Sequence, residues 1–192
     1  MFRLLKFLLF VVVVVLAGLA AAFVYARNTG LSARVTAGEL ETRIARLVRS
    51  WAVPPAARER ANPVPRSAEV MRTGLEHYAD HCASCHANDG SGQTSLGQSL
   101  FPPAPDMRRE ETQQLTDGEL FHIIEHGVRF TGMPAWSTGT PEGERASWEL
   151  VHFIRHLPRL TPEELEAMKA INPRPPAEIR QEIEEERFLQ GF

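Results

Sequence analysis

The chain has 192 residues and a net charge of -3, and 43% of its residues are hydrophobic. This length allows one medium domain with extensions, or two small domains. The slightly acidic balance gives no reason to expect nucleic acid as a partner.

The first predicted element is an uncharged apolar run over residues 7–26, preceded by Arg3 and Lys6. About twenty apolar residues is the length that spans a bilayer as a helix. The alternative is a secretory signal peptide, for which the alanines at 20–22 would offer a cleavage site. Because the apolar part of a cleaved signal is usually only about 7 to 15 residues long, the pattern favours an uncleaved transmembrane anchor over residues 1–27.

Residues 28–66 are predicted to hold an amphipathic helix followed by a proline-rich linker. The helix is expected over residues 36–51, where apolar side chains recur at helical spacing: Leu40, Ile44, Leu47, Val48 and Trp51. It could lie on the membrane surface or pack on the following domain, and the sequence leaves both open. Pro54 and Pro55 end it, and residues 56–66 are expected to be extended.

The next predicted helix begins at Ser67, a suitable N-cap, and its apolar face leads to Cys82. Gly74 lies inside this helix, where glycine costs about 1 kcal/mol relative to alanine. A close approach by a second helix would offset that cost. The apolar and aromatic segment 147–157 is the expected partner.

Cys82, Cys85 and His86 form a C-x-x-C-H motif, the arrangement that attaches a c-type haem. Two thiols three positions apart can add to the two vinyl groups of one porphyrin, and the following histidine can bind the iron. A thiol redox pair or half of a zinc site is the competing interpretation. A zinc site needs further ligands at similar spacing, and these are the only two cysteines in the chain.

The remainder of this domain, predicted over residues 67–160, alternates loops with helices. A glycine- and serine-rich loop over 87–100 leads into a stiff proline turn at 101–106. Thr116 or Asp117 can cap a helix that stops at Gly127, and a loop carrying Met133 follows. Since no strand pattern of any length is present, the sequence predicts a small all-α domain wrapped round a ligand.

Residues 161–192 are predicted to be a helical and acidic extension, starting with a helix capped by Thr161 and Pro162. Its acidic run at 182–187 is typical of a solvated surface. Six histidines form i, i+4 pairs on predicted helices, a spacing that can bind a metal, but none of the pairs has an obvious third ligand nearby. The pairs are His77 with His81, His122 with His126, and His152 with His156.

Taken together, these motifs resemble the class I, or mitochondrial-type, c-type cytochromes. The resemblance covers about residues 70–160 and rests on HCASCH, LFPPAPDM, LTDGELFHIIEHG and TGMPAW, in the order of the family. The chain looks most like bacterial membrane-anchored, single-haem members related to cbb3-type oxidase subunit III domains. One departure is Ala87, where many members have glycine.

This resemblance implies an all-α, cytochrome c-like fold with one covalently attached haem c. Cys82 and Cys85 would form the thioethers, His86 would be the proximal iron ligand and Met133 the distal one. A carbonyl of the proline turn, with Pro103 favoured, would accept a hydrogen bond from the His86 ring. A thioether ligand favours ferrous iron and so raises the potential, as an electron carrier requires.

The function that the resemblance implies is single-electron transfer between redox protein partners, with no catalysis by the chain itself. Haem is attached to such motifs outside the cytoplasmic membrane, so the haem domain is expected in the periplasm, held to the bacterial cytoplasmic membrane by a single-pass anchor. Two alternatives stay open: a haem subunit of a larger oxidoreductase complex, and a sensor or peroxidase-like enzyme with an open iron position.

Overall fold

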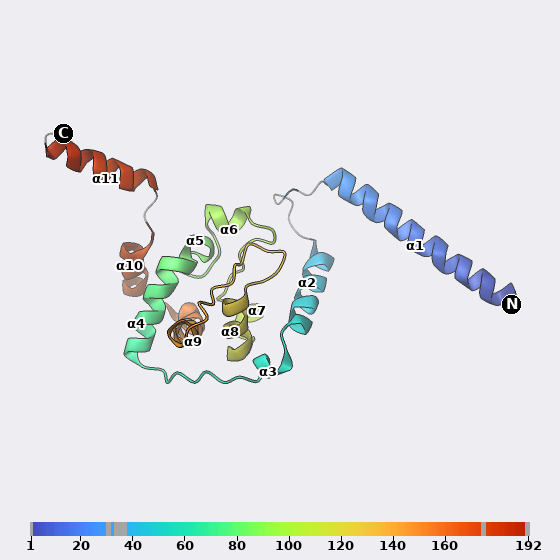
Figure 1. Ribbon diagram of the computed structural model, residues 1–192, viewed down its shortest axis with the longest axis horizontal. Helices are drawn as coiled ribbons and strands as arrows, with labels where there is room; N and C mark the ends of the chain where they lie inside the picture. The colour runs from blue at the N-terminus through green and yellow to red at the C-terminus, as the bar shows by residue number, and fades with distance from the viewer. Residues whose placement is uncertain (1, 30–31, 33–37, 174–175, 191–192) are drawn as a thin grey trace. The chain divides into compact units, whose positions relative to one another are not determined.

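The protein is described by a computed structural model that covers residues 2–29, 32, 38–173 and 176–190. Every regular element in these ranges is a helix, and they contain no strand (Figure 1). The contacts divide the chain into two compact units, 1–36 and 37–192. The expected all-α fold is therefore confirmed.

The first unit contains the helix α1 (Phe2–Thr29). Residues 2–28 form a helix that is long and apolar enough to cross a membrane. At 1.5 Å per residue, 28 residues extend over about 42 Å, which exceeds the roughly 30 Å of a hydrocarbon core. A membrane anchor and a signal sequence both meet these criteria.

The second unit is built on two long helices that pack against each other, α4 (Ala68–His77) and α9 (Pro141–His156). Ser67 caps α4, its hydroxyl accepting a hydrogen bond from the backbone of Val70 at 3.2 Å. Gly74 lies at the crossing, where a Cβ atom would be 2.7 Å from the carbonyl oxygen of Glu149 and 3.0 Å from Cβ of Phe153. The sequence-based pairing of Gly74 with this helix is thus confirmed.

We expect Gly74→Ala to lower the free energy of unfolding by roughly 1 to 2 kcal/mol, because the clash with a helix backbone outweighs alanine's better helix propensity. Denaturant titration of the holoprotein measures this change. Arg72→Ala on the exposed face of the same helix is the matched control, with an expected loss of at most about 0.5 kcal/mol for its ion pair with Glu76. A Gly74→Ala protein as stable as the wild type would show that the two helices can separate without cost.

Helix α8 (Asp117–His126) packs beside α9 and completes the core. Of the two predicted caps, Thr116 caps the helix and forms a capping box with Glu119. Gly127 ends the helix, as predicted, with a φ of +64°. The rings of Phe121 and Trp148 stack at 4.0 Å between the two helices. This stacked pair is buried in the core of the domain.

The segment before the domain differs from its predicted form. The amphipathic helix is present as α2 (Glu39–Ala52), but part of the stretch expected to be extended forms a helical turn, α3 (Pro55–Arg58). Proline is well tolerated in the first turn of a helix, which explains why Pro55 starts α3. Beyond it Val64 is buried and its carbonyl lies 2.7 Å from Nε2 of His152, so this stretch belongs to the core.

The remaining elements are short, apart from the two C-terminal helices. They are a π-helical turn η1 (Tyr78–Cys82), α5 (Ala83–His86), α6 (Ser95–Ser99), α7 (Glu110–Gln113), a 3₁₀ turn η2 (Leu157–Arg159), α10 (Pro162–Ile171) and α11 (Pro176–Leu189). Thr161 caps α10, as predicted, and forms a capping box with Glu164. Met168 is fully buried and Glu164 lies 2.9 Å from Nε2 of His156, so α10 folds onto the domain.

Candidate functional site

The C-x-x-C-H motif follows α4, where the chain continues as the π-helical turn η1 and then as the short α-helix α5. Tyr78 and Ala79 are buried in the π-helical turn, and Cys82 packs against the core at its end. The Tyr78 hydroxyl donates a hydrogen bond of 3.0 Å to the carbonyl of Ala87, where the helix ends with a φ of +60°. Single π-helical turns are frequent at functional sites, and the sequence pattern had not indicated this one.

The two cysteines are free thiols, both partly buried. Burial raises the pKa of the Cys82 thiol to about 12, with a smaller contribution from Cys85. Burial also raises the pKa of Cys85. Both groups therefore stay protonated at neutral pH, whereas a dithiol redox centre needs a lowered pKa in one of its cysteines.

The imidazole of His86 lies in a partly buried position at the end of α5. Burial lowers its pKa, and the backbone carbonyl of Pro105 acts in the opposite direction. Its Nδ1 atom is buried and has no hydrogen-bond partner. The turn carbonyl that acts on this ring is that of Pro105, whereas the sequence analysis favoured that of Pro103. A turn with three prolines does not reveal from its sequence which carbonyl faces the ring.

The glycine-rich loop folds back onto the motif through backbone contacts. The amide of Gly92 donates to the His86 carbonyl at 2.8 Å, and the Thr94 hydroxyl donates to the Cys85 carbonyl at 3.1 Å. A Cβ atom on Gly97 would lie 2.1 Å from the same Cys85 carbonyl. The amide of Ala104, in the proline turn, donates to Gly97, so the loop and the turn form one support for the motif.

Met133 lies half-buried in a tight loop after α8. Its amide donates to the Thr131 hydroxyl and its carbonyl accepts from the amide of Val128, both at 3.1 Å. Three residues later, the ring of Trp136 meets the ring of His81 edge-on at 5.4 Å. Since His81 directly precedes Cys82, this contact brings the Met133 loop to the attachment motif.

These residues fit a covalently bound haem. The two cysteines are free and lie on one short helical segment, the carbonyl of Pro105 acts on the His86 ring, and a thioether lies on a neighbouring loop. The buried Nδ1 atom of His86 has no hydrogen-bond partner, and a hydrogen bond from it to a carbonyl of the proline turn would fix the orientation of the ring.

Comparison with known proteins supports the same conclusion. Residues 69–154 match the family described as cytochrome C oxidase, cbb3-type, subunit III. This segment is a class I c-type cytochrome domain of the cbb3 type. Its cofactor is accordingly covalently bound haem c. A stretch of 41 residues is also 42% identical to thiosulfate dehydrogenase of Stutzerimonas stutzeri; it covers 21% of this chain and 13% of that protein.

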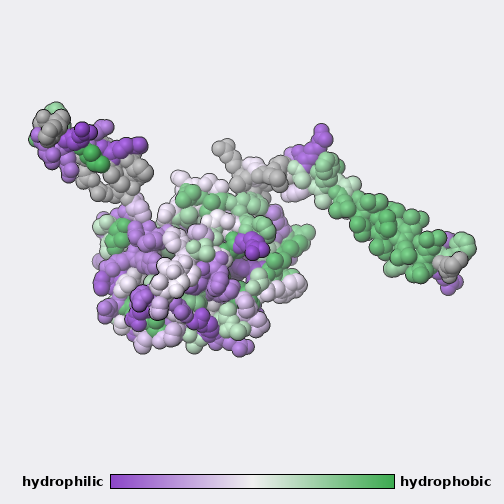
Figure 2. All heavy atoms as spheres, viewed as in Figure 1, coloured by the Kyte–Doolittle hydropathy of each residue, from purple (hydrophilic) through white to green (hydrophobic). Residues whose placement is uncertain are grey.

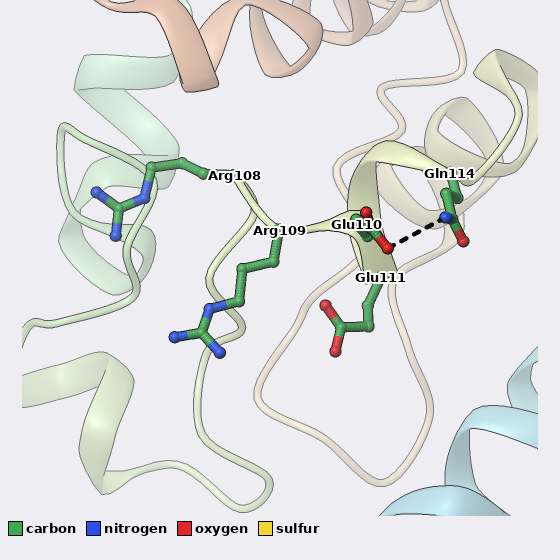
Figure 3. A pocket seen from close by; sticks show the side chains of 5 residues that line it. All are labelled: Arg108, Arg109, Glu110, Glu111 and Gln114. Atoms are coloured by element: carbon green, nitrogen blue, oxygen red, sulfur yellow. Dashed lines mark hydrogen bonds between the residues drawn. The ribbon is translucent and has the colours of Figure 1, made fainter.

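Other polar features of the cytochrome domain lack the groups that hold haem. A surface hollow at the start of α7 is lined by charged and amide side chains alone: Arg108, Arg109, Glu110, Glu111 and Gln114 (Figure 3). The His77 and His81 rings meet edge-on at 4.8 Å, and the His122 and His126 rings stack at 4.2 Å. Within the described residues, no group of three or more histidine, cysteine or acidic side chains could hold a metal ion.

The carboxylate of Asp106 links the proline turn to the following arginines. It accepts hydrogen bonds from the Arg108 guanidinium at 2.8 and 2.9 Å, and these, with a smaller contribution from Arg109, lower its pKa to about 2. An unfolded aspartate ionises near pH 4. The ionised carboxylate therefore stabilises the fold above about pH 4, and this contribution is lost as the pH falls towards 2.

We expect Asp106→Asn to lower the free energy of unfolding at pH 7 by no more than about 1 kcal/mol, because solvent screens a pair so near the surface. The difference from wild type should shrink between pH 5 and pH 3, by the linkage argument above. Urea titrations of both proteins at pH 7, 5 and 3 measure it. A difference that stays constant over this range would show that the Asp106 charge does not stabilise the turn.

Proposed function

We propose that the chain is a membrane-anchored c-type cytochrome that carries single electrons between redox proteins at the outer face of a bacterial cytoplasmic membrane. The observation that carries this proposal is the support of the Cys82, Cys85 and His86 motif by the glycine-rich loop, the proline turn and the Met133 loop, within a cytochrome domain. When bound, haem c supplies a ferric/ferrous couple that takes up and releases one electron.

Each side chain of the site has a role in this proposal. Cys82 and Cys85 would hold the cofactor through thioethers, and His86 and Met133 would bind the iron. The carbonyl of Pro105 orients the His86 ring, the role that the resemblance had suggested for Pro103. If both side chains bind the iron, no position would be left for a substrate, and the chain would carry electrons without catalysing a reaction of its own.

The helix α1 supports the membrane part of the proposal. It is an apolar helix of 28 residues with Arg3 and Lys6 at its start. Its uncharged run over residues 7–26 is longer than the apolar part of a typical cleaved signal. An anchor of this kind keeps the cytochrome domain at a high effective concentration beside membrane-bound redox partners. We propose that these partners include membrane oxidoreductases or oxidases.

A permanent haem subunit of a larger oxidoreductase complex is the second candidate. The family that residues 69–154 match is described as an oxidase subunit, which favours this alternative over a freely diffusing carrier. The similarity to thiosulfate dehydrogenase is confined to 13% of that protein, so it supports the cytochrome domain and does not extend to thiosulfate oxidation.

Potentiometric titration of the full-length holoprotein in detergent, followed by its visible absorption, tests the proposed function. We expect one reversible transition that fits a single electron, at a positive potential, as thioether ligation favours. A low potential, or turnover of peroxide by the purified protein, would contradict the proposal and favour an enzyme or sensor with an open iron position.

A further inference from the structure

The amphipathic helix α2 has its apolar side chains on the face that points away from the cytochrome domain. Five large residues recur on one side of the helix with between 49% and 75% of their surface exposed: Leu40, Ile44, Leu47, Val48 and Trp51. We call them the α2 strip; Figure 2 shows hydrophobic surface over this helix. An exposed strip of this size on a helix indicates a binding surface.

The polar side of α2 faces the cytochrome domain instead. Arg46 forms an ion pair with Glu111 of α7 at 3.5 Å, and the carbonyl of Ser50 accepts a hydrogen bond from the guanidinium of Arg58. Arg58 in turn pairs with Glu119 at 3.1 Å. Glu111, which lines the hollow in Figure 3, thus connects α2 with the domain.

The pKa of an arginine on this side of the helix also reflects its burial. The pKa of Arg49 is lowered by burial and by the neighbouring Arg46, while Glu119 acts in the opposite direction. A helix that packed by hydrophobic contact would bury the strip and expose its arginines. The reverse arrangement leaves the α2 strip available to a second apolar surface.

Chain continuity limits what that surface can be. Nine residues, 30–38, separate the end of α1 from the start of α2. An extended chain advances at most about 3.6 Å per residue, so α2 begins within roughly 35 Å of the end of α1. If α1 spans the membrane, α2 can reach the surface of that same bilayer.

We propose that the α2 strip inserts into the surface of the phospholipid bilayer that α1 spans. This inference rests on the proposed membrane anchoring. A helix that lies in the interface buries its apolar face about 5 to 10 Å deep, at the boundary of headgroups and acyl chains. Trp51 at the end of the strip suits this position, since tryptophan is enriched at membrane interfaces.

Two attachments of different kinds would then hold the cytochrome domain. The anchor sets how far the domain can move from the membrane, and α2 sets which of its faces points towards the lipid. Because α2 is connected with the domain by the Arg46–Glu111 pair and by the hydrogen bond from Arg58, its insertion fixes the orientation in which the haem site meets membrane-bound partners.

Thiol accessibility in lipid nanodiscs tests this inference. Haem attachment consumes both native cysteines, so a cysteine introduced into the holoprotein is its one reactive thiol. The variants are Leu47→Cys in the α2 strip, Ala45→Cys as the exposed control on the same helix, and Val13→Cys inside α1. Each is placed in discs of phosphatidylcholine and phosphatidylglycerol that hold one protein chain, and its reaction with a charged maleimide is followed.

We expect the thiol at position 47 to react at least about tenfold more slowly than the thiol at position 45, because a charged reagent does not enter the lipid. If positions 45 and 47 react equally fast while position 13 is protected, α1 spans the bilayer and the inference about α2 is overturned. If position 13 also reacts fast, the membrane anchoring itself fails, and the inference fails with it. The same reaction is also followed in discs that hold two protein chains. If position 47 is protected only in these discs, the α2 strip binds a second copy of the chain, and the proposal is contradicted.

Discussion

Replacing Met133 by leucine is expected to lower the midpoint potential of the holoprotein by on the order of 100 mV, because the soft thioether that stabilises ferrous iron is removed. Leucine has a similar volume and no group that can bind iron, so the loop should keep its form. The reduced variant should also bind carbon monoxide, whereas the reduced wild type should not. Potentiometric titration and absorption spectra with and without carbon monoxide measure both effects.

Met71→Leu is the matched control for this experiment. Met71 is also half-buried, but it lies on α4 and packs against the core. The control should keep the wild-type potential and should not bind carbon monoxide. If Met133→Leu behaved like the control, Met133 would not be an iron ligand, and the open-iron alternative would be favoured.

Replacing both cysteines, Cys82→Ala with Cys85→Ala, is expected to abolish covalent attachment completely. Most of the variant should then be unfolded or lack a cooperative unfolding transition, because a small domain that loses a large apolar cofactor cannot fill its core. Mass spectrometry under denaturing conditions measures the attached haem, and far-ultraviolet circular dichroism measures the helix content.

Ser84→Ala is the control within the motif, since Ser84 is exposed between the two cysteines. It should retain the full cofactor mass and the wild-type helix content. A double-alanine variant that still carried haem after denaturation would contradict thioether attachment at these positions. A variant that lost haem but unfolded as cooperatively as the wild type would show that the core does not depend on the cofactor.

Much of this fold could be predicted because its helix boundaries depend on local chemistry. Ser67, Thr116 and Thr161 each cap a helix through their own hydroxyl, and Gly127 ends one with a positive φ. Gly74 also indicated its partner helix, since a glycine inside a helix needs a compensating contact. The attachment motif needed no structure to be recognised, because Cys82, Cys85 and His86 lie within five consecutive residues of the sequence.

Features that depend on tertiary contacts could not be predicted in the same way. The π-helical turn before Cys82 has no sequence signature of its own, and several carbonyls of the proline turn could have faced His86. The apolar pattern of α2 identified an amphipathic helix but not which side faces the domain. That side depends on contacts with residues outside α2, namely the ion pair of Arg46 with Glu111 and the hydrogen bond from Arg58 to the Ser50 carbonyl.

The most direct test of the central claim is near-infrared magnetic circular dichroism of the ferric full-length holoprotein, which distinguishes sulfur from nitrogen and oxygen ligands of low-spin haem iron. The account predicts a single low-spin species with one histidine and one methionine ligand, and loss of the methionine signature in Met133→Leu. A high-spin spectrum, or a bis-histidine spectrum that Met133→Leu leaves unchanged, would contradict it.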